Sequence, residues 1–307
     1  MSAPRRVFAV VVNWNGGARM NLDCLASLVA EGLPPERIVF VDNASEDGSL
    51  EEVRLAHPRL RVVRNEENLG FAPASNQGMQ EALSAGADGV LFVNNDLVLE
   101  PGCLAGLVLF LAEQPGVGLC GPRILDAADP TRLWAAGGRV GWGPNLTFLR
   151  GHGQADGEVW RDSVEVDFVP GCALLVTGQA LVDTGGFDPA YFAYMEDVDL
   201  GLRARDAGHR AALVGEVAAR HSGSWSTGGG YNPRRKYMMA VNSVWFLRRH
   251  GTLRSWTGFV LFDVLLLPLA IAFQALRGNG RAALAKARGI VDGLRGRRVT
   301  AAAARRG

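Results

Sequence analysis

Several features that would assign this chain to a common protein class are missing from its sequence. The 307 residues contain only four cysteines, which lie far apart: Cys24, Cys103, Cys120 and Cys172. This spacing provides no close pair for a metal or redox motif and is typical of small core residues in a reducing compartment. The first apolar run, Val7–Val12, is too short for the apolar core of a signal peptide. We therefore expect the folded domain to be cytosolic.

Two further features of the sequence disfavour particular classes of function. The first predicted strand is not followed by the Gly/Arg/Lys-rich phosphate loop of nucleotidyltransferases, which disfavours that class. Nine basic residues lie between Arg277 and Arg306, against one acidic residue, Asp292, so the body before this tail is acidic although the whole chain has a net charge of +1. The basic residues accompany an apolar segment and not exposed aromatic side chains, so nucleic acid is not an expected partner.

Strands and helices alternate through roughly the first hundred residues. Short apolar runs predict strands at Val7–Val12, Arg37–Val41, Leu60–Arg64 and Val90–Val93. Apolar residues at helical spacing predict helices at Met20–Glu31, Ser49–His57, Ala74–Ala85 and Pro101–Gln114. Because the connections are short, this order predicts an α/β fold with a mostly parallel sheet flanked by helices.

The predicted strands end in similar polar residues: Asn13, Asp42, Asn68, and Asn94 with Asp96. Each alone is explained by an ordinary Asn/Asp turn. In a parallel sheet, however, all these ends lie on one edge, where open α/β sheets bind their ligands. A carboxylate at this edge suits a hard divalent cation of the kind that accompanies a diphosphate. The four ends together therefore predict a ligand site.

The second half of the chain is less regular. Residues Val117–Val169 suggest a mixed sheet with long loops, and Val166–Thr177 suggests a further strand pair. Glu196, Asp197 and Asp199 then open a helix that continues to Gly208. The helix dipole accounts for one or two acidic residues in a first turn. The aromatic residues that precede them would place a carboxylate against apolar surface and raise its pKa toward that of a general base.

A last strand, Arg210–Val217, leads to His221, which heads a Gly/Ser segment at Gly228–Gly230 that is suited to fold over a ligand. The sequence at this point resembles the family 2 inverting glycosyltransferases, most closely the bacterial rhamnosyltransferase-like branch. The likeness spans Val7 to Ser226. Its motifs are Val12–Gly16, Val41–Ser45 with Asp47–Ser49, Asn68–Phe71 with Asn76–Gly78, Asn94–Asp96, Gly185–Asp188 and Glu196–Leu200.

This resemblance implies a GT-A (Rossmann-like) fold, a dTDP- or UDP-sugar donor and a divalent cation, Mg²⁺ or Mn²⁺. The residues that it implies for nucleotide-sugar binding are Asn13, Asn15, Asp42, Asn43, Asn68, Gly70, Asn76, Asn94 and Asn95. It implies Asp96 and His221 for the metal, and Asp197 as the catalytic base with Glu196 as its neighbour and substitute. Asn94 stands where the family's Asp-x-Asp motif has its first Asp, so metal affinity rests on Asp96 and the diphosphate.

The C-terminal region has a different character. Residues Tyr231–Arg249 predict an amphipathic helix, and Trp256–Leu276 is an apolar run of 21 residues, or about 31 Å of helix, near the roughly 30 Å of a bilayer core. Asp263, Pro268 and basic flanks on both sides favour a re-entrant or interfacial hairpin broken near Pro268. A true span and a buried soluble helix are the alternatives. The hairpin would place the protein at the cytosolic face of the plasma membrane.

The sequence thus predicts a catalytic domain at residues 1–230, a helical membrane-associated segment at 231–276 and a basic tail at 277–307. The expected activity is metal-dependent, inverting transfer of a sugar, with dTDP-rhamnose as the leading donor, to a glycan or polyprenyl-diphosphate-linked acceptor in cell-surface polysaccharide synthesis. A UDP-sugar donor and a catalytically idle nucleotide-sugar-binding scaffold are the alternatives. The oligomeric state is open, with a homo-oligomer as one option.

Overall fold

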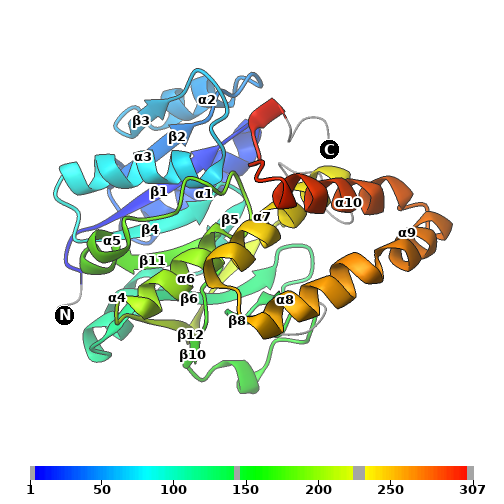
Figure 1. The fold of residues 1–307 in the computed structure, drawn as a ribbon. Coiled ribbons are helices and arrows are strands. Elements are labelled where there is room, and N and C mark those ends of the chain that lie inside the picture. The colour runs from blue at the N-terminus through cyan, green and yellow to red at the C-terminus, as the bar shows by residue number, and fades with distance from the viewer. Residues whose placement is uncertain (1–3, 142–145, 224–231, 303–307) are drawn as a thin grey trace.

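The computed structural model describes residues 4–141, 146–223 and 232–302, and a ten-stranded sheet lies at its centre (Figure 1). The first half of the sheet is parallel, in the order β3-β2-β1-β4. Its strands are β1 (Val7–Asn13), β2 (Ile38–Asp42), β3 (Arg61–Arg64) and β4 (Gly89–Asn94). The helices between them are α1 (Ala18–Ala30), α2 (Ser49–Ala56) and α3 (Phe71–Ser84), with a short 3₁₀ turn at Pro35–Arg37. The parallel sheet predicted for this region is confirmed.

The second half of the sheet is mixed. Beyond β4 the order continues β11-β6-β12-β10, with β11 antiparallel to both of its neighbours and β6 parallel to β12. These strands are β6 (Val117–Asp126), β10 (Val164–Val166), β11 (Ala173–Thr177) and β12 (Arg210–His221). The short strands β5 (Leu97–Leu99) and β7 (Leu133–Ala135) pair with β12 and β6. A separate hairpin joins β8 (Gly138–Val140) to β9 (Thr147–Leu149), and a 3₁₀ turn lies at Glu158–Trp160.

The mixed sheet predicted for Val117–Val169 is present, with β6 and β7 in it, and two local predictions in this half were wrong. Residues 117–126 form a long, mostly buried strand, although Gly118, Gly121 and Pro122 weaken its apolar pattern. The register of the β6–β12 pair shifts next to Pro122, and such an irregularity accommodates a residue that donates no ladder hydrogen bond. The strands β10 and β11 do not pair with each other, since β12 and β6 lie between them. The last strand runs on to His221 instead of ending at Val217.

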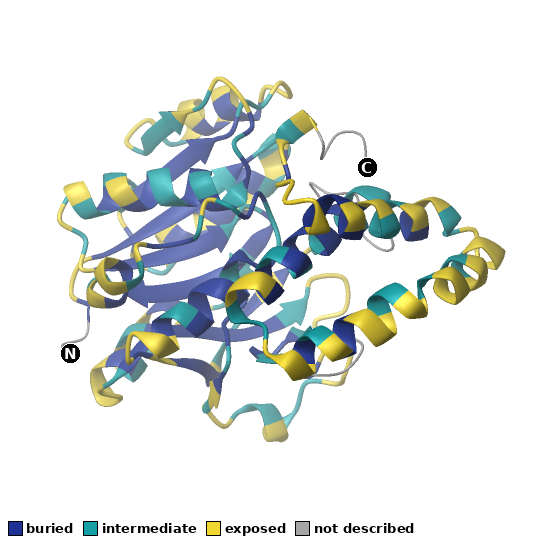
Figure 2. Cartoon of the chain, viewed as in Figure 1, coloured by how far each residue is buried: buried dark blue, intermediate teal, exposed yellow. Residues whose placement is uncertain are grey.

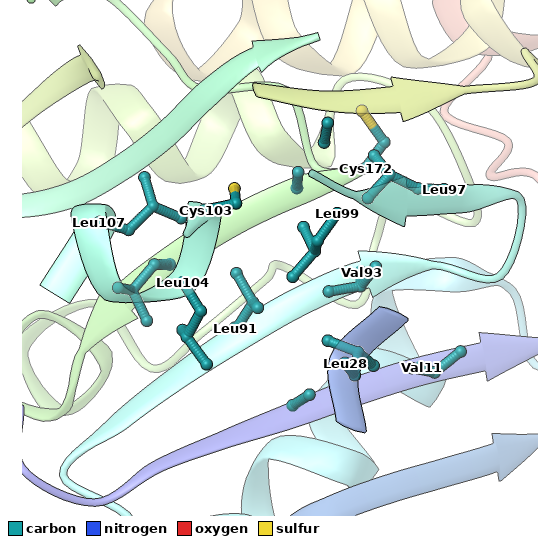
Figure 3. Close-up of a cluster of buried hydrophobic side chains, with 14 of the residues drawn as sticks. Val11, Leu28, Leu91, Val93, Leu97, Leu99, Cys103, Leu104, Leu107 and Cys172 are labelled. Carbon is teal, nitrogen blue, oxygen red and sulfur yellow. The ribbon is translucent and has the colours of Figure 1, made fainter. Parts of the chain in front are cut away.

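Helices cover both faces of the sheet. On one face lie α1, α2 and α4 (Cys103–Glu113), and on the other α3, α5 (Gly178–Thr184) and α6 (Glu196–Asp206). Side chains of β1 alternate between the two layers: Val11 packs toward α1, as Figure 3 shows, and Val10 packs toward α3. All four cysteines are buried and unpaired, as predicted. Both faces of the parallel strands are buried, which explains why their sequences are continuous apolar runs.

The C-terminal region is a set of helices that packs beside the sheet and then extends away from it (Figure 1). It comprises α7 (Pro233–His250), α8 (Leu253–Phe259), a π-helical segment (Val260–Leu265), α9 (Leu267–Leu276) and α10 (Gly280–Leu294). The helix α10 lies against α7 so closely that a Cβ on Gly289 would stand 2.5 Å from the carbonyl oxygen of Tyr237. The boundary predicted between residues 230 and 231 lies outside the described residues.

The apolar segment, residues 260–276, is exposed along its length (Figure 2). Neither the π-helical segment nor α9 contains a buried residue, so this part of the apolar run does not pack into the core, whereas Gly258 and Phe259 at its start are buried. The helix is interrupted near Pro268 as predicted, but the chain does not turn back there, because α8 with the π-helical segment and α9 are bent by only 46°, and α10 returns after α9 (Figure 1). In the part of the chain that the structure describes, no single helix is long and apolar enough to cross a membrane. This bent pair satisfies length and composition together.

Candidate active site

A cavity of about 290 Å³ opens at the carboxyl edge of the parallel strands, between the end of β4 and the start of α6. Its walls include residues from α7, so the C-terminal region contributes to it. Nine predicted site residues line this cavity: Asn43, Asn68, Gly70, Asn94, Asn95, Asp96, Glu196, Asp197 and His221. The cavity thus brings together side chains that are up to 178 residues apart in the sequence, from Asn43 to His221.

Asn13 and Asp42 do not line the cavity, although their neighbours Val12 and Asn43 do. Asn13 and Asp42 are directly opposite each other in the β1–β2 register, and Asn13 Nδ2 donates a hydrogen bond of 3.0 Å to Asp42 Oδ1. The backbone N–H of Ser45 donates to Asp42 Oδ2 at 3.1 Å. Both side chains are fully buried. The strand ends therefore meet as predicted, and here the two residues hold the loops that follow β1 and β2.

Asn43, Asn68 and Gly70 form the adjoining part of the cavity. Asn43 Nδ2 donates to Asn68 Oδ1 at 2.9 Å and to the Gly70 carbonyl at 3.1 Å. Gly70 has φ +94°, and a Cβ there would stand 2.5 Å from the carbonyl oxygen of Phe192. Both the backbone conformation and the space therefore require glycine. This contact joins the loop before α3 to the segment that precedes α6.

Asn15 and Asn76 lie away from the cavity. Asn15 is exposed, and its Oδ1 accepts a hydrogen bond of 2.8 Å from the backbone N–H of Glu46. Asn76 Nδ2 donates to the Phe187 carbonyl at 2.7 Å, and Asn76 Oδ1 accepts from the Phe187 N–H at 3.0 Å. The structure therefore gives these two residues contacts that hold loops, and their contacts with the donor stay a prediction of the resemblance.

The two predicted metal ligands face each other across a strand pairing. Asp96 lies in the turn between β4 and β5, and His221 ends β12, which pairs with β5. His221 Nε2 is 3.0 Å from Asp96 Oδ1 and 3.5 Å from Asn94 Nδ2. The indole of Trp134 packs edge-on against the imidazole, with ring centroids 4.5 Å apart. The tertiary fold thus fixes a buried carboxylate and a buried imidazole side by side.

This pair fits one side of a divalent cation. Asp96 Oδ1 is buried and, despite its closeness to His221, receives no hydrogen bond of proper geometry. A buried carboxylate oxygen without a donor is costly unless another cation or donor compensates it. Within the described ranges, no group of three or more His, Cys, Asp or Glu side chains is arranged to hold a metal. The remaining ligands would therefore come from a diphosphate and water, which suits Mg²⁺ or Mn²⁺.

The carboxylates that open α6 are held in place by the backbone before them. Tyr194 and Met195 both have φ +73°, a conformation rarely adopted by residues with side chains. The fully buried Asn242 of α7 donates hydrogen bonds to the carbonyls of Ala193, at 2.8 Å, and Tyr194, at 2.9 Å. The helix α7 thus supports the strained turn that directs Glu196 and Asp197 toward the cavity.

Asp197 and Glu196 have different environments. Asp197 Oδ2 accepts from the Gly171 N–H at 2.9 Å, and Oδ1 accepts from the Val198 N–H at 2.8 Å. Burial raises the pKa of Asp197, and these two hydrogen bonds oppose the rise. Burial and then the charge of Asp197 raise the pKa of Glu196 well above its usual range, and Glu196 Oε2 has no hydrogen-bond partner among the described residues. Of the two, Asp197 is the one whose hydrogen bonds favour the ionised carboxylate, the form that a general base needs.

Asp199, the third carboxylate, points away from the cavity. It is fully buried, and it accepts hydrogen bonds from Arg203 Nε at 2.6 Å and His250 Nε2 at 2.8 Å. Burial would raise the pKa of Asp199, but the hydrogen bond from His250 and the charge of Arg203 outweigh it and lower the pKa. Asp199 therefore anchors α6 to α7 and does not serve as a base.

Sequence reasoning missed the residues that α7 contributes to the cavity. Arg234, Arg235, Met238 and Met239 all line it, and the Arg234 guanidinium lies 4.5 Å from the ring centroid of Trp14. The start of a helix was the signal that could have identified these residues. Asn232 caps α7, because its side-chain oxygen accepts a hydrogen bond from the Arg234 N–H. The Gly/Ser segment that was predicted to fold over a ligand lies outside the described residues.

The sheet order and the helical layers define the GT-A fold. The fold is that of the mannosyltransferase PcManGT from Pyrobaculum calidifontis in complex with GDP-Man and Mn²⁺, with a TM-score of 0.59 and 18% identity, covering 96% of this chain and 88% of that one. It is also that of GalNAc-T7 with UDP, GalNAc and Mn²⁺, with a TM-score of 0.57 and 14% identity, covering 88% of this chain and 57% of that one.

The sequence identifies the family. The chain belongs to glycosyltransferase family 2, because the model described as "Glycosyl transferase family 2" matches residues 9–176. It is rhamnosyltransferase-like, since it is 30% identical over 223 residues to the N-acetylglucosaminyl-diphospho-decaprenol L-rhamnosyltransferase of Mycobacterium tuberculosis. That match covers 66% of this chain and 72% of the relative. The resemblance seen in the motifs is therefore confirmed.

Proposed function

We propose that the protein transfers a sugar, with inversion at the anomeric carbon, from a nucleotide-diphospho-sugar to a hydroxyl group of a polyprenyl-diphosphate-linked glycan in cell-surface polysaccharide synthesis. One observation carries this proposal: the base Asp197 and the Asp96–His221 pair line the same cavity. The name of the mycobacterial rhamnosyltransferase favours rhamnose as the sugar and a polyprenyl-diphosphate acceptor, and dTDP-rhamnose is the donor that the resemblance implies. The UDP bound by GalNAc-T7 keeps a UDP-sugar as the second candidate.

In the proposed reaction the acceptor hydroxyl attacks the anomeric carbon from the side opposite the diphosphate. Asp197 takes the hydroxyl proton as the new C–O bond forms and the bond to the diphosphate oxygen breaks. The segment before α6 and the Gly171 N–H hold the carboxylate in position. A divalent cation bound by Asp96 and His221 would supply positive charge for the departing diphosphate. An idle scaffold would need neither a positioned base nor a metal-ligand pair, which disfavours that alternative.

Nucleotide binding tests this proposal. Calorimetry with dTDP, UDP, GDP and ADP on the full chain, in Mn²⁺ and again in EDTA, should show metal-dependent binding of dTDP or UDP alone. The positive result would assign the donor class, because the sugar would then be sought among donors of one nucleotide. If folded protein binds none of the four nucleotides in either condition, the glycosyl-transfer proposal fails.

We also propose that the apolar segment places the protein at the cytosolic face of the plasma membrane. Leu269 and Phe273 are 69% and 54% exposed, and Arg277 follows α9 directly with its guanidinium 4.8 Å from the Phe273 ring centroid. Apolar side chains beside basic ones suit an interface with anionic lipid. Asp263, which would oppose burial in lipid, forms an ion pair with Lys286.

The double variant Leu269→Glu/Phe273→Glu should lose co-sedimentation with phosphatidylglycerol vesicles, because charges on the apolar segment oppose its entry into lipid. A truncation before Trp256 is a poorer test because it also removes α10, which packs on α7. The control Leu55→Glu/Leu109→Glu changes two apolar residues on other helices that are 83% and 58% exposed, and it should bind as the wild type does. Vesicle binding that survives in the Leu269→Glu/Phe273→Glu variant contradicts the membrane proposal.

A further inference from the structure

Three cations gather where α7 begins, and we call Arg235, Lys236 and Lys286 the basic cluster. Arg235 and Lys236 are in the first turn of α7. The helix α10 runs parallel to α7, since Gly289 meets Tyr237 and Gly293 meets Val241, so Lys286 lies beside that first turn. Burial and then the charges of Lys286 and Arg235 lower the pKa of Lys236. The three side chains are therefore close enough to repel one another.

Asp263 lies against the cluster: it pairs with Lys286, and its charge acts to raise the pKa of Lys236. Lys236 and Lys286 are also the only two lysines in the sequence, in which the other residues of the Lys/Arg type are all arginines. Like charges held together destabilise a folded chain unless a counter-charge binds. The cluster is thus suited to an anion that carries more than one negative charge.

The cluster also lies between two features of the site. Arg235 lines the cavity, and its guanidinium is 5.6 Å from the ring centroid of Tyr194, two residues before the start of the Glu196–Asp197 pair. On the other side, Lys286 pairs with Asp263, which belongs to the exposed apolar segment. A ligand with a sugar, an anionic group and an apolar chain would find a matching surface for each part in this order.

We propose that the basic cluster binds the diphosphate of a polyprenyl-diphosphate-linked acceptor, with the acceptor sugar in the cavity and the prenyl chain along residues 260–276. This inference rests on the proposed function for its acceptor class. It separates two phosphate sites: the donor diphosphate belongs beside Asp96 and His221, and the acceptor diphosphate belongs beside Arg235, Lys236 and Lys286. Charge-assisted hydrogen bonds from several cations suit a diphosphate.

The first test uses farnesyl diphosphate as a short polyprenyl diphosphate and the full chain. The variant Arg235→Gln/Lys236→Gln should raise the Kd for farnesyl diphosphate about tenfold or more, because two charge-assisted contacts are lost. The Kd for dTDP or UDP should change less than about threefold. The control Arg19→Gln/Arg54→Gln removes two exposed charges from other helices and should leave both affinities unchanged.

The remaining outcomes would contradict the inference, and each would assign the cations or the apolar segment a different role. Equal loss of nucleotide and farnesyl diphosphate affinity would assign the cations to the donor. Unchanged farnesyl diphosphate affinity, with weaker binding to phosphatidylglycerol vesicles, would assign them to lipid headgroups. Inorganic pyrophosphate, which lacks the prenyl chain, should bind more weakly than farnesyl diphosphate and with the same sensitivity to the variant. If the wild type binds pyrophosphate as tightly as farnesyl diphosphate, the apolar segment takes no part.

A second measurement needs no variant. Amine acylation followed by mass spectrometry reports on Lys236 and Lys286 individually, because the chain has no other lysine. Farnesyl diphosphate should slow acylation of both, and dTDP should not. Absence of protection at saturating farnesyl diphosphate overturns the inference. Failure of the proposed function is a separate result, since it would appear as absence of nucleotide binding while lysine protection is still measured.

Discussion

Replacing Asp197 by asparagine is expected to abolish sugar transfer and to leave nucleotide binding nearly intact. Asparagine keeps the shape of the side chain and an oxygen that accepts from the Gly171 N–H. It cannot take a proton from the acceptor hydroxyl, and a positioned general base contributes about 10²- to 10⁴-fold to a rate. Initial rates of nucleotide release with dTDP-rhamnose and with UDP-sugars, together with calorimetric Kd values, measure both effects.

The control for this prediction is Glu196→Gln. Burial and the charge of Asp197 raise the pKa of Glu196 and so favour its neutral, protonated form, which the amide resembles, and the variant should therefore retain much of the activity. A wild-type rate in Asp197→Asn, together with an inactive Glu196→Gln, would exchange the two roles. The rate of the wild type should also fall as the pH drops through the raised pKa of Asp197, since only the ionised carboxylate acts as a base.

Replacing Asp96 by alanine should remove the metal dependence of nucleotide binding and lower the transfer rate at least about a hundredfold. Only His221 of the pair would remain, and a cation that stabilises a leaving diphosphate contributes several kcal/mol to the transition state. The expected effect is larger than it would be in a motif with two acidic residues, because the other position of this motif is Asn94, whose amide carries no charge. Titrations with dTDP and UDP in Mn²⁺ and in EDTA provide the measurement.

Asp206→Asn is the matched control for Asp96→Ala. Asp206 ends α6 and is 66% exposed, so its loss changes one negative charge without touching the cavity. It should behave as the wild type does in both titrations. If Asp96→Ala retains Mn²⁺-dependent binding with unchanged affinity, the cation is held elsewhere and the assignment of Asp96 is wrong.

The sequence by itself determined the parallel half of the sheet and its polar edge. Strands buried on both faces require continuous apolar runs, and the polar residues that follow them form hydrogen bonds within their own turns. Both patterns are local, so they can be recognised in the sequence. The start of α6 could be predicted in the same way, from a run of carboxylates that follows aromatic residues. Asp199, however, shares that run and proved to be an anchor for α7, because its role depends on Arg203 and His250.

The tertiary structure alone decided which of these polar residues work together. Asp96 meets His221 because β5 pairs with β12, a contact between segments more than 100 residues apart. The turn before α6 is held by Asn242, and the basic cluster forms only because α10 packs against α7. Such contacts depend on packing between distant elements and leave no periodicity in the chain. The sequence determined the elements and the chemistry available at their ends, and packing decided which of these groups face the cavity.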